Sequence, residues 1–459
     1  TAAGFFSFST SPVVPIQHLG IYAGLGCLFA FVVTVMLIPA LLSLLPMPDA
    51  ARTERYHEGI VSRSLESLGD WVERNAGAVL GVSAALFAAS IIGISMVNVE
   101  GNTMAYLSKD HWVRQAITFM QDRLGGLSSF EVVFSGDEDT AKDPVLLRAI
   151  DQMQREILED PQVSNSFSHV NYLKDINQSL NEGRPEMNRV PKTSDMVAQY
   201  LLLAETSGDD DINRFVNYDY SKVRVTSRCP ATLSKEYLDM MDRAQEIVTD
   251  AVRVSGVQAN ITGVVPLYAK FDRLLLSSQM QSLALAFFII YLFMTVLMKS
   301  WKIGLLSMIP NGLPIFMTLA LMGYFGFNLD AATVMIAGIA LGIAVDDTVH
   351  YLNRFHVELG KADWNYSEAA RRATHVVGRP IFFTSVILLV GFGVLVFGNF
   401  RPTRMFGYLT GLTMIFALIG DLVLLPALLL KLKPWGDAPA TQAEIGPALA
   451  GGPEQGGIA

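Results

Sequence analysis

One mostly apolar stretch of the sequence carries two adjacent aspartates and a histidine. It reads GIALGIAVDDTVHYL over residues 338–352 and contains Asp346, Asp347 and His350. An ionised aspartate at mid-bilayer costs roughly 3 kcal/mol on the insertion scale, so two would cost about 6 kcal/mol. Either other groups compensate these charges or the aspartates are not permanently ionised. The pattern therefore favours carboxyl groups that load and unload protons inside a membrane.

The small and polar residues of this stretch are spaced to lie on one face of a helix. Gly338, Gly342, Asp346 and His350 follow one another at intervals of four residues. Small residues allow a neighbouring helix to approach closely, which would turn Asp346 into the bundle as the core site. Asp347, its coupled neighbour, points about 100° away. His350 would relay protons to water or be an ordinary interfacial histidine. The alternative for both aspartates is a headgroup position at the helix end.

Two hydroxyl groups and a third carboxyl group lie in later apolar stretches. Thr384 and Ser385 could donate hydrogen bonds to an aspartate, although hydroxyls in helices often bond their own backbone instead. Asp421 lies near the end of the last apolar stretch. There we expect a membrane-buried polar residue with a structural partner.

Two prolines flank an asparagine in the segment PNGLP. Pro310 and Pro314 each remove a backbone N–H from a helix, so the chain should bend near Asn311. A hinge or packing role is a better interpretation of Asn311 than proton chemistry.

The composition is that of a membrane protein diluted by soluble sequence. Of 459 residues, 51% are hydrophobic and 17% charged, against about 25% charged in soluble domains. The net charge of −9, without a dense Lys/Arg block, argues against nucleic acid as a partner. Cys27 and Cys229 lie in different environments, so we expect free thiols. We expect no cofactor, no metal and no enzymatic activity, because an aspartyl hydrolase needs carboxylates converging from different helices.

Apolar runs long enough to approach a bilayer span divide the chain into domains. A helical polytopic membrane protein with an inserted extracytoplasmic α/β domain is therefore the expected fold. The expected order is the last spans of a first transmembrane half (1–46), an amphipathic linker helix (47–77), the first span of a second half (78–97), the α/β domain (98–270), a five-span bundle (271–432) and a disordered tail (433–459).

The polar domain alternates strand-like and helical segments. Strand patterns at 129–136, 222–228 and 257–263 accompany helical patterns at 143–160 and 234–252. This order predicts a porter-like α/β layer of split βαβ units. Residues 165–220 do not fit the sheet and could form a lid or a flap.

An internal repeat relates the first residues to the last span. A shift of 387 positions without a gap aligns Gly4 with Gly391, Gly20 with Gly407, and PALL at 39–42 with PALL at 426–429. The first residues therefore read as the end of a first half, and a parent with both halves would have twelve spans. Parallel repeats of this kind are typical of transporters.

The distribution of Lys and Arg near the span ends predicts the orientation. Most of them fall on one side, which would be cytoplasmic and would place the α/β domain outside; Arg401 and Arg404 disagree.

Four segments resemble the second half of the resistance-nodulation-division (RND) superfamily. They are KSWKIGLLSMIPNGLPI, GIALGIAVDDTVHYLNRFH, GRPIFFTSVILLVGFGVLVF and FRPTRMFGYLTGLTMIFALIGDLVLLPALL. The branch they resemble comprises bacterial exporters of hopanoid or sterol type, related to mycobacterial lipid (MMPL-like) exporters and to Patched. The resemblance covers residues 271–432 closely and 1–46 through the matching half.

The resemblance implies a proton-driven exporter of hydrophobic or amphiphilic molecules in the bacterial inner membrane, with its large domain in the periplasm. By position, Asp346 and Asp347 would be the relay carboxylates, with Thr384 and Ser385 as hydroxyl neighbours. The implied partners are a lipid-like substrate, the bilayer and a missing first half of the same protein; a periplasmic carrier protein and further copies of the chain are also candidates. The alternative function is a sterol-sensing, Patched-like protein that binds lipid without transport.

Overall fold

The computed structural model describes residues 1–44, 59–98, 106–107, 110–206, 210–230, 234–330 and 332–436. The chain forms two compact units. One comprises Thr1–Asn98 with the chain from Leu275 onward, and the other is Val99–Leu274. Residues 45–46 of the predicted first half, 47–58 of the predicted linker and 437–459 of the predicted tail lie outside the described residues.

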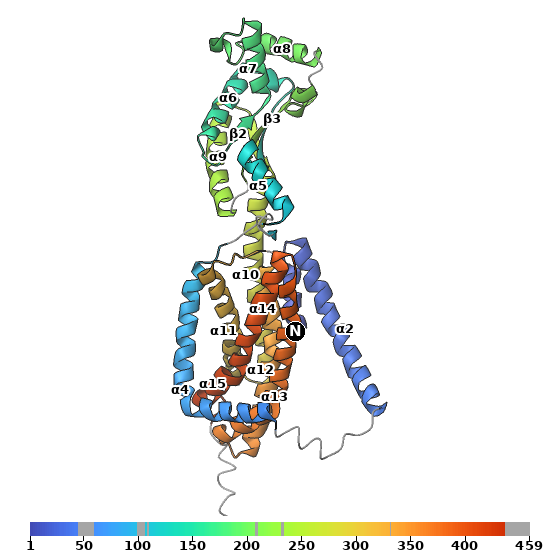
Figure 1. Ribbon diagram of the computed structural model, residues 1–459, viewed down its shortest axis with the longest axis vertical. Coiled ribbons are helices and arrows are strands. Elements are labelled where there is room, and N and C mark those ends of the chain that lie inside the picture. Colours follow the sequence, from blue (N-terminus) through green and yellow to red (C-terminus); the bar gives the residue numbers. More distant parts are fainter. Residues whose placement is uncertain are drawn as a thin grey trace, which may run out of the picture. The chain divides into compact units, whose positions relative to one another are not determined.

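The first unit is a helical bundle (Figure 1). In the described part of the chain, seven helical segments are long and apolar enough to cross a membrane. The elements of this unit are α1 (Ala2–Phe6), η1 (Ser7–Thr10), α2 (Val14–Leu44), α4 (Ile60–Ser95), α10 (Val264–Leu297, shared with the second unit), α11 (Trp301–Phe325), η6 (Thr333–Met335), α12 (Ile336–Lys361), α13 (Tyr366–Gly393), η7 (Val394–Phe397), α14 (Arg401–Ile419), η8 (Gly420–Leu424) and α15 (Leu425–Leu432).

The most buried helices of the bundle are α11, α12 and the α14–α15 segment. The reason is visible in α12, where Leu341, Val345, Thr348, Leu352 and Phe355 recur at intervals of three or four residues and are all buried. This stripe packs into a core that α11, α13 and α15 complete. The centre of α12 is thereby fixed from several sides.

Helix α4 changes direction at Asn75, whose backbone leaves helical values at φ −115° and ψ 18°. Figure 1 shows the segment before this break lying across the ends of the bundle helices. Leu65 and Val72 of that segment are buried in the bundle core, whereas Trp71 is half exposed. The predicted linker helix is therefore continuous with the following span, and part of its apolar face packs on protein.

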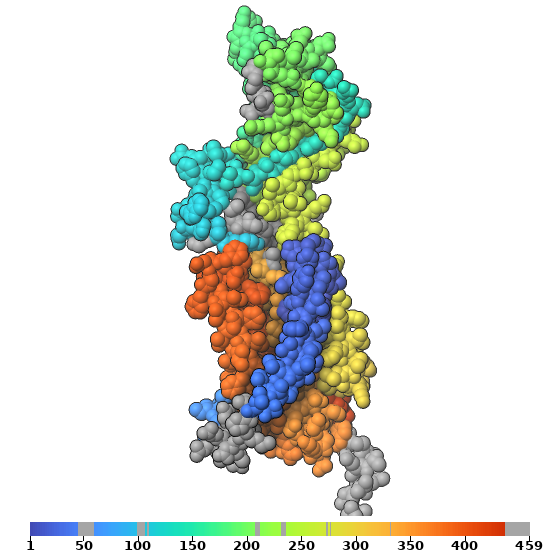
Figure 2. Space-filling model, turned by 90° about the vertical axis from the view of Figure 1, so that its right-hand side faces the viewer, coloured from blue at the N-terminus to red at the C-terminus, as the bar shows by residue number. Residues whose placement is uncertain are grey.

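The internal repeat is confirmed by the helix boundaries and by a shared glycine contact. Helix η1 and helix η7 begin and end 387 positions apart, and α2 matches α14 through α15 at the same shift. An added Cβ at Gly20 would lie 2.7 Å from Cβ of Phe8, and one at Gly407 would lie 2.7 Å from Cβ of Leu395, which is the same contact in the second copy. Much of α2 is exposed, and it forms a ridge on the outside of the bundle (Figure 2).

The second unit is built on a four-stranded antiparallel sheet. Its strands β1 (Ser128–Ser135), β2 (Asn165–Phe167), β3 (Lys222–Cys229) and β4 (Gln258–Gly263) lie in the order β2-β3-β1-β4. Helix α6 (Pro144–Leu158) connects β1 to β2, and α9 (Ser234–Ser255) connects β3 to β4. The predicted split βαβ arrangement is thus confirmed.

The remaining elements of this unit are α5 (Trp112–Leu124), η3 (Thr140–Lys142), α7 (His169–Leu180), η4 (Pro185–Met187), α8 (Ser194–Thr206) and η5 (Asp210–Arg214). One face of β1 carries Phe130, Val132 and Phe134, all fully buried in the core of the unit. Cys229 is a buried free thiol at the end of β3, and burial raises its pKa to about 12.

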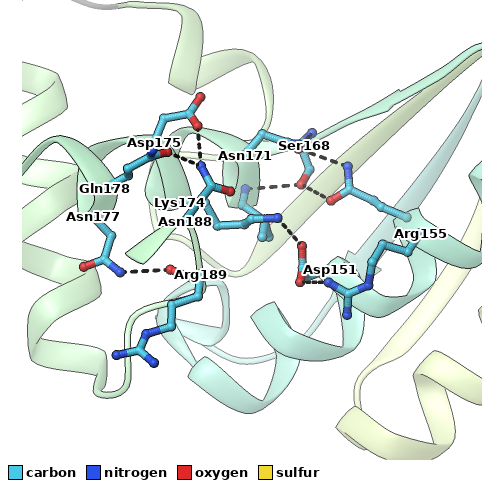
Figure 3. Close-up of polar contacts among 12 residues, drawn as sticks. Asp151, Arg155, Ser168, Asn171, Lys174, Asp175, Asn177, Gln178, Asn188 and Arg189 are labelled. Atoms are coloured by element: carbon cyan, nitrogen blue, oxygen red, sulfur yellow. Dashed lines mark hydrogen bonds and ion pairs between the residues drawn. The ribbon is translucent and has the colours of Figure 1, made fainter. Parts of the chain in front are cut away.

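Residues 165–220 were not expected to fit the sheet, which is wrong for their first three residues, because these form β2 and pair with β3. Most of the remaining described residues of this segment form helices, and polar contacts help to hold them (Figure 3). Lys174 of α7 pairs with Asp151 of α6 at 2.8 Å. Asn177 donates to the carbonyl oxygens of Met187 at 2.9 Å and Arg189 at 3.1 Å, which fixes the connection to α8. Side chains here satisfy loop backbone groups. The buried face of α8, formed by Val197, Tyr200, Leu201 and Ala204, packs into the core of the unit.

Candidate functional site

The predicted small-residue face of α12 packs against α1. An added Cβ at Gly4 would lie 2.8 Å from Cα of Gly342, and one at Gly338 would lie 2.4 Å from the ring of Phe8. The close helix approach expected from the glycines therefore occurs. Asp346 on the same face accepts a hydrogen bond from the hydroxyl of Thr1, but its side chain is 54% exposed. Asp346 is thus the more exposed of the two aspartates, and its place as the core site stays a prediction.

Asp347 is more enclosed and lies beside the predicted hydroxyls of α13. Thr384 Oγ1 lies 3.4 Å from Oδ1 of Asp347 and 2.9 Å from the carbonyl oxygen of Ile381. Its single hydrogen favours the shorter contact, so the bond to Asp347 is weak. Ser385 is buried near the same carboxylate, and His350 is exposed one turn further along α12. The structure thus brings Asp347, Thr384 and Ser385 together and leaves His350 outside.

Three deeply buried polar side chains of the bundle, those of Asn311, Thr348 and Asp421, form a cluster that we call the buried cluster. Each of these side chains is at most 2% exposed. Thr348 Oγ1 lies 2.5 Å from Oδ1 of Asp421 and 3.2 Å from Oδ1 of Asn311. Asn311 donates from Nδ2 to the carbonyl oxygen of Ser307 at 2.7 Å. The cluster joins α11, α12 and η8, and Asp421 also interacts electrostatically with Asp347.

Prolines and a glycine let the helices of the buried cluster approach each other. Pro314 has no N–H, so the carbonyl of Pro310 lacks its usual helical donor. The backbone of Gly420 comes so close to this carbonyl that an added Cβ would lie 2.9 Å from its oxygen. Asp421 follows directly, in a π-helical turn, a feature that is frequent at functional sites. Helix α11 is continuous through both prolines, and Asn311 is packed within the buried cluster.

The buried cluster has two hydrogen-bond arrangements, because a threonine hydroxyl has only one hydrogen. If Asp421 is ionised, Thr348 donates to Asp421 and cannot also donate to Asn311. If Asp421 carries a proton, that proton can be donated to Thr348 Oγ1, and Thr348 can donate to Asn311. The protonated arrangement satisfies every donor and acceptor pair along the chain Asp421, Thr348, Asn311 and Ser307.

Sequence reasoning missed Thr348. It stands next to the aspartate pair, yet it belongs to the opposite, apolar face of α12 with Leu341, Val345 and Leu352. A polar residue within a helical stripe of otherwise apolar residues was the available signal, since such a group needs a buried partner.

Comparison with known proteins agrees with this architecture. The profile of the MMPL family matches residues 115–447. The membrane protein MJ1562 of Methanocaldococcus jannaschii is 24% identical over 347 residues, covering 73% of this chain and 86% of that protein. The structure of the hedgehog release protein Disp from the water bear Hypsibius dujardini matches with a TM-score of 0.61 at 14% identity; the match covers 93% of this chain but only 56% of that one. The chain thus belongs to the MMPL family of multi-span membrane transporters of the RND type.

Proposed function

We propose that the protein exports hydrophobic or amphiphilic molecules, of lipid, sterol or hopanoid type, and that proton movement through the buried cluster drives it. The single observation that supports this most strongly is the pair of alternative hydrogen-bond arrangements around Asp421. A carboxyl group in a membrane helix whose partners can accommodate both protonation states is suited to carrying a proton.

The change of partner gives protonation a mechanical consequence. With Asp421 ionised, Thr348 connects α12 to η8 at 2.5 Å; with Asp421 protonated, the same hydroxyl is free to connect α12 to α11 through Asn311. In the protonated state the proton of Asp421 keeps the link between η8 and α12 while Thr348 adds the link to α11. The ionised state therefore joins two helices and the protonated state joins three, which is the kind of bistable element that a rocking transporter needs. One proton falling through 100 mV supplies roughly 2.3 kcal/mol, enough to bias such an equilibrium about fiftyfold.

The proposed proton route runs from Asp421 to Asp347 and then outward. Asp347 interacts with Asp421 and with His350, and Asp346 is its neighbour at the exposed edge of α12. Thr384 and Ser385 flank Asp347 from α13. In this scheme Asp346 and His350 exchange protons with water, and Asp347 passes them to the buried cluster.

For the setting, we propose the bacterial inner membrane with the Val99–Leu274 unit in the periplasm. The Lys and Arg distribution supports this orientation, since positive residues near span ends favour the cytoplasmic side. A lipid-like substrate fits a lipid-handling family.

The test is movement of a fluorescent apolar lipid in liposomes under an imposed pH gradient. We expect Asp421→Asn and Asp347→Asn to abolish gradient-driven movement while lipid binding persists. Asp363→Asn is the matched control, because it makes the same chemical change at an exposed position just beyond α12. Full gradient-driven movement in Asp421→Asn would overturn the proposed coupling. Equal lipid binding with no response to the gradient in any protein would favour the sensing alternative instead.

A further inference from the structure

An apolar cleft of about 710 Å³ is lined by residues of α4, α10, α11, η8 and α15. Its walls are mainly Leu, Ile, Met and Phe side chains. Among the described residues that line it, Lys302 is the single charged one. The volume lies within the range of about 300–1,000 Å³ that is typical of ligand sites.

The ends of the cleft differ in character. Toward the middle of α11, Phe316 packs edge-on against Phe87 of α4, with ring centroids 5.0 Å apart and planes at 70°. At the other end lie Trp301 and Lys302 in the first turn of α11, both exposed. Tryptophan and lysine at a span end mark the headgroup region of a bilayer. The cleft therefore runs from the headgroup region into the hydrocarbon layer, as the acyl chain of a lipid does.

A second cation lies near the headgroup end. Lys431 of α15 is exposed, and its Cε is 4.0 Å from where a Cβ would lie on Gly77 of α4. Gly77 is one turn before Leu80, which lines the cleft. Lys302 and Lys431 thus place positive charge at the end where a phosphate would lie.

We propose that this cleft binds an anionic phospholipid, with one acyl chain between α4 and α11 and the phosphate on Lys302. Apolar lining alone would not select a lipid, because the surrounding tails are equally apolar. The cleft supplies dispersion contacts to a chain that fills it, and the lysine supplies the preference for negative headgroups. The lipid is a bound component of the transporter, so the site stands independently of the proposed proton route.

The test is native mass spectrometry of the purified protein titrated with phosphatidylglycerol and with phosphatidylcholine of identical chains. We expect phosphatidylglycerol to bind more tightly and Lys302→Gln to weaken it about fivefold, the effect of one lysine at an anionic surface, with phosphatidylcholine unchanged. Lys299→Gln is the matched control, because Lys299 is exposed three residues earlier and does not line the cleft. Equal loss in both variants would reduce the effect to general surface charge and would overturn the proposal.

A second variant tests the acyl chain. Ala84 lines the cleft from α4 and is exposed, so Ala84→Trp fills the space without entering the bundle core. We expect this variant to lose binding of both lipids. Unchanged lipid binding in this variant would show that the cleft is not the site. A mass spectrum of a dimer without bound lipid would also overturn the proposal.

Discussion

Removing the hydroxyl of Thr348 should reveal how Asp421 is held. Thr348→Val keeps the side-chain shape but takes away the donor that lies 2.5 Å from Asp421. A hydrogen bond to an ionised group contributes about 1.5–3 kcal/mol, whereas hydrogen bonds between membrane helices average about 0.6 kcal/mol. We therefore expect a loss of about 2 kcal/mol in the free energy of unfolding when Asp421 is ionised. When acid protonates Asp421, the substitution removes two neutral hydrogen bonds of about 0.6 kcal/mol each, and the expected loss falls to about 1.2 kcal/mol.

The assay is reversible unfolding in mixed micelles at several pH values, with a second substitution to complete a double-mutant cycle. Asp421→Leu removes the carboxyl group and leaves Thr348 free to donate to Asn311, so by itself it should cost little. In the Asp421→Leu background, Thr348→Val should cost far less than in the native protein, because no carboxylate is left without a donor.

The pair Thr318 and Thr413 provides the control. Their hydroxyls lie 2.8 Å apart and are as deeply buried, but neither can ionise in this pH range. Thr413→Val should cost about 0.6 kcal/mol at every pH. If Thr348→Val costs no more than Thr413→Val, or shows no pH dependence, the two-arrangement reasoning is refuted.

Two further predictions concern other parts of the chain. His169 is fully buried, and burial lowers its pKa from 6.5 to about 4. On acidification the unfolded chain therefore binds a proton at this histidine before the folded chain does. The free energy of unfolding should fall by about 3 kcal/mol as pH drops from 6.5 to 4. Urea unfolding at several pH values measures this dependence, which should be weaker in His169→Gln. Gly4→Ala should lower the free energy of unfolding by about 1–3 kcal/mol, because the added Cβ would press on the α12 backbone. Gly391→Ala is the control at the equivalent position of the repeat, where an added Cβ meets open space, and it should leave stability unchanged. Equal shifts of the thermal unfolding midpoint in the two variants would contradict this.

The spans, the repeat and the split βαβ units could be predicted from the sequence because each leaves a local or periodic signal. The length of an apolar run identifies a span. The shift of 387 positions identifies the internal repeat from the sequence alone. Between β2 and β3, helix α8 has such a signal, because its buried residues Val197, Tyr200, Leu201 and Ala204 recur at helical spacing. The connection before α8 had none, since Asn177 holds it through loop carbonyl groups, and such contacts leave no pattern in hydrophobicity.

The candidate site was only partly predictable. Helical spacing grouped Asp346 with Gly338 and Gly342, but spacing cannot say which neighbour covers that face or how far it extends. The neighbour is the short helix α1, and Asp346 lies at its edge. Asp421 and Asn311 were noticed separately, yet their connection depends on Thr348 and on the π turn at Gly420, which arise only when three helices pack together.

The two copies of the repeat, α2 and the α14–α15 segment, share glycine contacts but not a buried carboxyl group. Helix α2 is an ordinary α-helix over Val33–Leu37, the residues that match the π turn, and Thr34 stands where the second copy has Asp421. Glycine contacts that shape the backbone recur in both copies, whereas the carboxyl group and the turn that inserts it occur in one. If both copies carried an aspartate at this position, protonation would affect both of them alike. If Asp421 carries a proton as proposed, protonation at this position would change the second copy of the repeat and not the first.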